Sequence, residues 1–357
     1  MGFYTVPLRY SGLYTPVITA RLSGTRTLAF ALVVLASLFT AACSRGRGRV
    51  IDVVYISAPQ VFLRDRVAPV YNKIGVLKNA ERVEVLDHDR RFLKVRTASG
   101  TEGWIEQRYT IGQDTYNQLQ KLADDNKDTP VQANGTTRND TNIHLEPARD
   151  SEHLYQLSQG SKVYILKRAS SEKQPGTASP AAAPGKKQPS ATVMEDWWLI
   201  RDAQNRTGWV LSRMVDIDVP LDIAQYAEGQ RIQAFFPLDE IQDGDKKVAE
   251  YLVLLSEPKD GMLFDFNQVR VFTWNVRRHR YETAYREHGL EGFFPVSVSH
   301  ESFDKEGNLP VFTLKARDAA GNLVDRKYKL NTPMVRRVLA PGEVPERRPA
   351  ARRAKRG

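Results

Sequence analysis

Two segments of this 357-residue chain repeat each other, and this repeat limits the possible folds more than any other feature. The first copy, residues 50–111, ends in Phe-Leu-Lys-Val-Arg, a turn and Gly-Trp-Ile. The second copy, residues 142–220, ends in Trp-Trp-Leu-Ile-Arg, a turn and Gly-Trp-Val. The residues that bracket the turn have the same spacing in both copies: Arg96 and Trp104 in the first, Arg201 and Trp209 in the second. The repeat predicts two small domains of one design.

Each copy has the alternating pattern of short β-strands bounded by turn residues. In the first copy, Val83, Val85 and Val95 point to one face of the expected sheet. Several short strands in so few residues bury an apolar face by curling into a small barrel. Gly103 and Gly208, each directly before a tryptophan, indicate either a close approach of two backbones or a bulge at a barrel corner.

The two copies resemble the bacterial SH3 domain. The family's ending is a bulky aromatic, an apolar-x-apolar strand, a polar turn, Gly-Trp-Val/Ile and a short terminal turn. Here this ending runs from Phe92 to Tyr109 and from Trp197 to Met214. The resemblance covers residues 50–111 and 142–218, and it implies binding of peptidoglycan stem peptides or their cross-bridges. The second copy departs from the family at Leu145-Glu146-Pro147, where a Leu-Arg pair is usual.

The residues after the repeat have a different pattern. Residues 221–335 contain seven strand-like runs separated by Gly- and Asn-containing turns, which predict an antiparallel β-sandwich or barrel of unrecognised type. Trp274, Tyr281 and Tyr285 line a ligand groove in one interpretation and form core pairs in the other. The seven runs are Arg231–Phe236, Val248–Ser256, Val269–Asn275, Tyr281–Arg286, Phe293–His300, Val311–Arg317 and Val324–Leu330.

The expected organisation is therefore all-β, with disordered ends. The predicted parts are a signal segment at 1–42, an SH3-like barrel at 50–112, a linker with a short helix at 113–140, a second barrel at 141–219 with a disordered insertion at 169–192, the β domain at 221–335 and a basic tail at 336–357.

The single cysteine, Cys43, follows the apolar run 28–42 and the small residues Thr40 to Ala42. This pattern resembles the lipobox of bacterial lipoproteins, which implies cleavage before Cys43, a lipid on its sulfur and a location in the cell envelope, facing the periplasm or the exterior. An ordinary cleaved signal with a free thiol and a single-pass anchor are the alternatives. The run has about 15 residues, whereas a spanning helix needs about 20.

The formal charge of +10 is concentrated at the two ends of the chain. Residues 1–49 carry six arginines and no acid, and residues 336–357 carry eight basic and two acidic residues. Each end therefore carries +6, which leaves −2 for residues 50–335. A near-neutral folded part argues against a nucleic-acid partner, and the basic tail is either a contact with anionic polymer or lipid, or a solubilising segment.

The lack of recognisable catalytic motifs in the sequence favours a protein that is not an enzyme. A Cys–His peptidase needs a second thiol, and the sequence has no His-Glu-x-x-His, Gly-x-Ser-x-Gly or phosphate-loop motif. His279 and His288 flank an expected strand. They are interpreted more simply as surface histidines than as ligands of a metal ion. We expect neither a metal nor another cofactor.

These observations favour a non-catalytic lipoprotein whose tandem SH3-like domains bind cell-wall peptide. Aromatic side chains of Trp104, Tyr109, Trp197 and Trp209 are candidates for groove walls, with Arg96 and Arg201 as carboxylate partners. Core packing is the alternative for Trp104 and Trp209, whereas Trp197 is expected to be more exposed because Trp198 alternates to the opposite face. Two other functions stay open: an envelope scaffold that binds another protein through residues 221–335, and an accessory to a secreted hydrolase.

Overall fold

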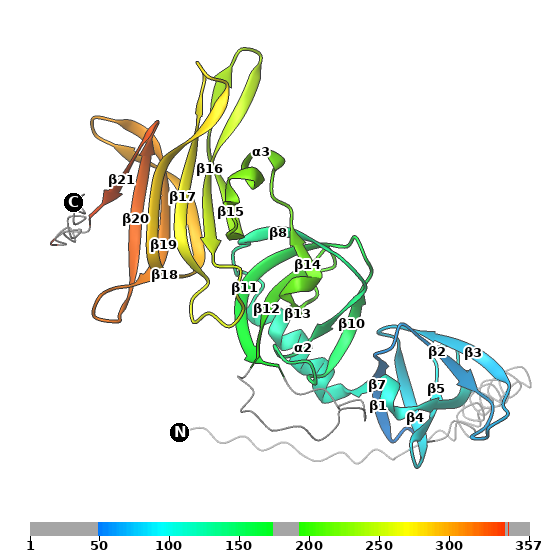
Figure 1. The fold of residues 1–357 in the computed structure, drawn as a ribbon. Coiled ribbons are helices and arrows are strands. Elements are labelled where there is room, and N and C mark those ends of the chain that lie inside the picture. The colour runs from blue at the N-terminus through cyan, green and yellow to red at the C-terminus, as the bar shows by residue number, and fades with distance from the viewer. Residues whose placement is uncertain (1–48, 174–192, 340–341, 343–357) are drawn as a thin grey trace, which may run out of the picture. The chain divides into compact units, whose positions relative to one another are not determined.

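The computed structural model describes residues 49–173, 193–339 and 342, and most of this backbone is extended (Figure 1). The strands form three antiparallel sheets of seven strands each. The expected all-β class is therefore confirmed. The predicted signal segment, 1–42, and Cys43 lie outside the described residues.

The first sheet forms around one apolar core. Its hydrogen-bonded order is β3-β2-β6-β5-β4-β1-β7, and six of these strands contribute to one buried cluster that includes Ile56, Leu63 and Val95. The sheet curls enough to enclose this core, but its edge strands β3 and β7 do not pair, so no closed barrel is present among the described residues. Its strands are β1 Asp52–Ile56, β2 Gln60–Arg64, β3 Lys73–Lys78, β4 Arg82–Asp89, β5 Phe92–Arg96, β6 Glu102–Glu106 and β7 Thr110–Gly112, with the 3-10 turn η1 Gln107–Tyr109 between β6 and β7.

The second sheet has the same strand order as the first. Its order, β10-β9-β13-β12-β11-β8-β14, becomes that of the first sheet when each strand is replaced by its counterpart seven places earlier. The sequence repeat is thus a repeat of topology. The elements are β8 Ala133–Thr137, β9 Thr141–His144, β10 His153–Leu157, β11 Lys162–Glu172, β12 Met194–Asp202, β13 Thr207–Leu211, the 3-10 turn η2 Ser212–Met214 and β14 Val215–Ile217.

Both glycines before the repeated tryptophans lie where another backbone comes close, as predicted. A Cβ on Gly103 would lie 2.8 Å from the carbonyl oxygen of Arg64, and one on Gly208 would lie 2.7 Å from that of His144. The strand partners agree, because Arg64 is the register partner of Trp104 and His144 that of Trp209. The two copies therefore share this corner in detail.

Helix α2, Gln113–Asp125, follows the first sheet directly. Its Tyr116 stacks on Tyr55 of β1 with ring centroids 4.0 Å apart, and its Leu119 is buried in a core cluster shared with the second sheet. The apolar side of the helix is thus used for packing.

The third sheet is a meander in which each strand pairs with the next along the chain (Figure 1). The two predicted strands Tyr281–Arg286 and Phe293–His300 are one long strand, and a final strand was not predicted. The short helix α3 Leu221–Ala224 and the turn η3 Gln225–Ala227 precede the sheet. Its strands are β15 Arg231–Asp243, β16 Lys246–Ser256, β17 Phe266–Asn275, β18 Arg280–Phe303, β19 Gly307–Arg317, β20 Leu323–Asn331 and β21 Met334–Val338.

Two predicted boundaries need correction. The insertion was expected to begin at residue 169, but β11 continues to Glu172 because it stays paired with β12 up to Met194. The tail was expected to begin at residue 336, but Arg336 and Arg337 belong to β21, which pairs with β20. Residues 174–192, 340–341 and 343–357 lie outside the described part.

Candidate functional site

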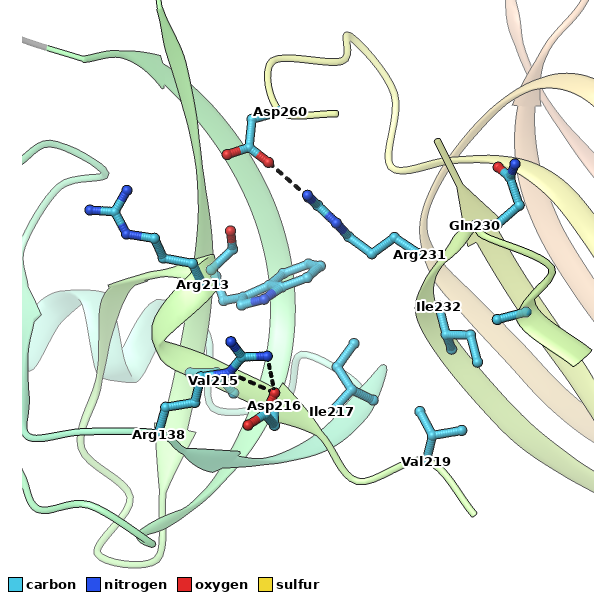
Figure 2. Close-up of a pocket in the computed structure, with 13 residues that line it drawn as sticks. Arg138, Arg213, Val215, Asp216, Ile217, Val219, Gln230, Arg231, Ile232 and Asp260 are labelled. Carbon is cyan, nitrogen blue, oxygen red and sulfur yellow. Dashed lines mark hydrogen bonds and ion pairs between the residues drawn. The ribbon is translucent and has the colours of Figure 1, made fainter. Parts of the chain in front are cut away.

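A pocket of about 450 Å³ opens beside β14, where the chain passes from the second sheet to the third (Figure 2). Trp198 of β12 and Val215 and Ile217 of β14 line it from the second sheet. Val219 and Ile232 line it from the segment that leads into β15 and from β15 itself. Apolar side chains from both segments therefore line the pocket.

Arginine–carboxylate pairs surround this lining. Figure 2 shows two of them, Arg138 with Asp216 and Arg231 with Asp260. The Arg138 Nε donates to Asp216 Oδ1 at 2.7 Å, and the Arg231 Nη1 donates to Asp260 Oδ1 at 2.8 Å. The hydrogen bond to Asp216 raises the pKa of Arg138, so this guanidinium stays charged.

Arg213, in the turn η2, is the most exposed of the three arginines. Its side chain is 57% exposed and lies 3.2 Å from Glu195, which is itself 4% exposed. Glu195 already accepts two hydrogen bonds of 2.6 Å from Arg149, and the Arg149 bond is the main reason that its pKa is lowered. Because Arg149 already compensates the buried carboxylate, Arg213 is the arginine best able to turn toward a ligand.

The first sheet has a pocket of about 340 Å³ at the equivalent place. Leu93 corresponds to Trp198, Gln107 to Ser212 and Thr110 to Val215, each with the offset that separates Trp104 from Trp209. Ile111 and Gly112 correspond in the same way to Asp216 and Ile217. Two copies of one fold thus place a pocket beside the 3-10 turn that follows the Gly-Trp strand.

The two arginines predicted as ligand partners have partners within the protein. Arg96 is 9% exposed and donates to Glu102 Oε1 at 3.1 and 2.9 Å. Arg201 donates to the carbonyl oxygens of Asn126 and Lys127 at 2.5 and 2.8 Å, just after helix α2. Both lie outside the two pockets, and in this structure they hold a strand pair and a helix end.

The expectation that Trp197 is exposed is wrong. Its side chain is 2% exposed, packs edge-on against His144 at 5.4 Å and has no hydrogen-bond partner for its Nε1 among the described residues. The other indoles of the repeated ending, Trp104 and Trp209, are half-buried. Tyr109 is also half-buried, with the Arg108 guanidinium 4.7 Å from its ring centre.

Sequence reasoning therefore missed Trp198 and the residues of the terminal turns. The available signal was the second half of the repeated ending, Gln-Arg-Tyr-Thr-Ile-Gly in the first copy and Ser-Arg-Met-Val-Asp-Ile in the second. These segments align without a gap, and they supply much of the lining of both pockets.

Within the described ranges, no group of three or more His, Cys, Asp or Glu residues could hold a metal ion. His279 Nδ1 donates to Asp243 Oδ2 at 2.7 Å rather than joining His288. No helix in this part of the chain is both long and apolar enough to span a membrane.

Comparison with known proteins identifies one part of the chain. Residues 60–111 match the family model of the bacterial SH3 domain, which suggests a cell-wall-related function. No curated protein matches the chain.

Among solved structures, NlpC2 from Trichomonas vaginalis is similar with 10% identity, a TM-score of 0.16, and coverage of 80% of this chain and 95% of that one. NlpC1 from the same organism has 10% identity, a TM-score of 0.17, and coverage of 78% and 88%. An NlpC/P60 family protein from Bacillus cereus ATCC 10987 has 10% identity, a TM-score of 0.21, and coverage of 79% and 95%.

These neighbours correct the expectation that the chain is not an enzyme. NlpC/P60 is a family of peptidoglycan hydrolases, so the expectation of a non-catalytic protein is withdrawn. At TM-scores of 0.16 to 0.21 the likeness assigns no reaction to this chain either.

Proposed function

We propose that this protein binds peptidoglycan peptide in the cell envelope through the two equivalent pockets. The observation that carries the proposal is the recurrence of one pocket in two sheets of identical strand order, the first of which matches the bacterial SH3 model. The apolar linings offer contact area, and Arg213 offers a charge-assisted hydrogen bond to a peptide carboxylate. In this proposal the second sheet is a second SH3-like module.

Two weak sites on one chain gain avidity on a polymer that presents many copies of the ligand. We therefore expect the full chain to co-sediment with intact peptidoglycan sacculi and to remain bound at high salt. Contacts that depend only on the basic ends weaken with salt, because exposed charges are screened beyond about 10 Å at 0.1 M ionic strength.

The test compares variants of exposed pocket residues. Arg213→Ala in one pocket and His88→Ala in the other should each reduce binding to sacculi, and the double variant should reduce it by about tenfold or more. Arg277→Ala is the matched control, since Arg277 is an exposed arginine in the turn between β17 and β18, and its side chain makes no hydrogen bond or ion pair with another described residue. Equal binding by the double variant and the control would refute the proposal.

Two other outcomes point elsewhere. Sedimentation that is lost at high salt would reduce wall binding to the electrostatics of the basic ends. Recovery of the chain only together with another envelope protein would support the scaffold alternative for residues 221–335.

Anchoring by a lipid on Cys43 is a separate part of the proposal, supported by the sequence pattern before that residue. In cells that process lipoproteins, the wild-type chain should be recovered in the membrane fraction. The mass spectrum of Cys43→Ser should show a chain without lipid. A wild-type chain that carries an unmodified thiol would contradict the anchor.

A further inference from the structure

The third sheet has a pocket of its own, about 540 Å³ in volume, at the end of the β15–β16 hairpin. Six charged, polar or aromatic side chains line this pocket, those of Asp222, Asp243, Lys246, Trp274, His279 and Tyr281. None of these residues lies in the segment that matches the SH3 model. The pocket therefore needs an explanation independent of the two repeats.

The carboxylate of Asp243 is fixed in position with one oxygen still available. Its Oδ2 accepts from the Trp274 Nε1 at 2.8 Å and lies 2.7 Å from the His279 Nδ1. No hydrogen bond to its Oδ1 is present among the described residues. The hydrogen bonds from His279 and Trp274 lower the pKa of Asp243, so it is an anion at neutral pH.

A second carboxylate, that of Asp222 in helix α3, lines the same pocket. Its side chain is exposed and makes no hydrogen bond or ion pair with any described residue. Lys246 is the one lysine of the lining. Two carboxylates stand against one ammonium, so the pocket attracts cations and repels anions whenever the His279 imidazole is neutral.

The polar atoms of both aromatic side chains are already hydrogen-bonded, so the rings have only their π surfaces left to offer a ligand. The Trp274 Nε1–H is donated to Asp243, and the Tyr281 hydroxyl is donated to the carbonyl oxygen of Ala249 at 2.8 Å. The two rings pack edge to face at an interplanar angle of 74°, with centroids 5.0 Å apart. An indole face beside a carboxylate is a favourable environment for an ammonium group, which gains from both.

The turn that carries His279 is held in an unusual conformation. His279 has φ +45, in the left-handed region that non-glycine residues rarely adopt. The Asn275 side-chain oxygen accepts from the backbone N–H of Arg277 and Arg278 at 3.0 and 3.1 Å and so stabilises this turn. Strain of this kind persists where the surroundings impose it, and it is concentrated at ligand sites.

We propose that this pocket binds an alkylammonium group of the kind at the end of a lysine or other diamino-acid side chain. The ammonium would lie on the face of Trp274 and donate to Asp243 Oδ1 and to Asp222. The inference does not depend on the function proposed for the two repeats, so either can fail alone.

The probe is N-acetyl-lysine methylamide, which has one ammonium and no other charge, titrated into the full chain. The readout is the Nε1–H resonance of Trp274, assigned by its loss in Trp274→Phe. We expect a saturating shift with a dissociation constant on the order of millimolar, typical of one small contact.

Four variants test the assignment of roles. Asp243→Asn should weaken binding about tenfold, because it removes a charge-assisted bond, and Asp222→Asn should weaken it less. Lys246→Gln should strengthen binding, because it removes a competing cation. Asp239→Asn is the matched control, a carboxylate on the same strand outside the pocket lining, and should leave the dissociation constant unchanged.

Equal binding of N-acetyl-norleucine methylamide, which lacks the ammonium, would overturn the proposal. So would a Trp274 resonance that does not move with the lysine probe. Asp243→Asn removes the charge that strengthens two internal hydrogen bonds and can disturb the fold, but the side chains of Asp222 and Lys246 make no hydrogen bond or ion pair with another described residue. If neither Asp222→Asn nor Lys246→Gln changes the affinity, the proposal is also overturned.

Discussion

The guanidinium of Arg168 and the carboxylate of Asp196 form a buried ion pair across the neighbouring strands β11 and β12. Their atoms Nη2 and Oδ1 are 2.7 Å apart, and the side chains are 4% and 2% exposed. Arg168 Nη1 also donates to the carbonyl oxygens of Met262 and Phe264 at 3.0 and 2.9 Å, and Asp196 Oδ1 accepts from the Gly261 N–H at 2.9 Å. This pair therefore ties the second sheet to the segment that precedes β17.

Breaking this pair by Asp196→Asn should lower the free energy of unfolding by about 3 to 5 kcal/mol, because the buried charge of Arg168 then keeps only the more distant carboxylate of Asp265, 3.7 Å away, as an ionic partner. Asp125→Asn is the control, since the Lys121–Asp125 pair is 74% and 57% exposed and such pairs contribute about 0 to 1 kcal/mol. Urea denaturation measures both. A loss for Asp196→Asn no greater than that of the control would contradict the structural role given to the pair.

The close approach at Gly208 gives a second prediction. A Cβ there would overlap the Cγ2 of Ile143 and lie 2.7 Å from the carbonyl oxygen of His144. Gly208→Ala should therefore destabilise the protein by about 1 to 3 kcal/mol, the usual cost of overpacking. At Gly112, the N-cap of α2, a Cβ meets nothing within 4 Å and φ is −76, so Gly112→Ala loses only the N-cap preference for glycine and should cost less than Gly208→Ala in the same denaturation experiment.

The alternation of apolar and polar residues predicted side-chain burial best in strands that bury only one of their two faces. Val83, Val85 and Val95 were assigned to one face by alternation, and they are 1%, 2% and 0% exposed. The same rule failed for Trp197 and Trp198, which were expected on opposite faces with Trp197 the more exposed. Both are buried, because the strand carrying them packs on both faces, and the cover on each face comes from residues distant in sequence.

The binding residues were harder to predict for the same reason. Arg96 and Arg201 have the spacing of the repeat, but a spacing does not reveal which acceptors fold against a guanidinium. Arg96 meets Glu102 across the strand pair, whereas Arg201 meets carbonyl groups that follow a helix about 75 residues earlier. The pocket beside β14 depends on Arg231 at the start of β15 and on Asp260 in the connection between β16 and β17, a juxtaposition that no local pattern contains.

The neighbouring rings of His144 and His153 predict a loss of stability in mild acid. Their centroids are 5.3 Å apart, and burial lowers the pKa of both from the ordinary 6.5. The folded state therefore binds protons less readily than the unfolded state, so their contribution is present above about pH 6.5 and is lost as the pH falls through the lowered pKa values.

His153→Gln should reduce this dependence, so that the melting temperature falls less between pH 7 and pH 5 than in the wild type. His300→Gln, at an exposed position of the third sheet, should leave the dependence as it is. An unchanged pH profile in His153→Gln would show that these histidines do not determine acid stability.

Glu250 predicts a dependence of the opposite sign. Its side chain is fully buried, accepts from the Thr332 hydroxyl at 2.5 Å and from the Trp274 backbone N–H at 3.2 Å, and has no ion-pair partner among the described residues. Burial raises its pKa above the ordinary 4.5. The folded state therefore holds this proton more tightly than the unfolded state, so the stabilisation is complete below about pH 4.5 and is lost as the pH rises through the raised pKa.

Glu250→Gln imitates the protonated carboxyl at every pH, so it should stabilise the protein at pH 7 and have little effect at pH 4. Each unit by which the pKa is raised corresponds to about 1.4 kcal/mol between these limits. Denaturant midpoints at pH 4 to 8 measure the difference, with the exposed Glu240→Gln as the control. If Glu250→Gln and the wild type show parallel profiles, Glu250 carries its charge in the folded state as readily as in the unfolded one, and its neighbours must compensate the buried anion.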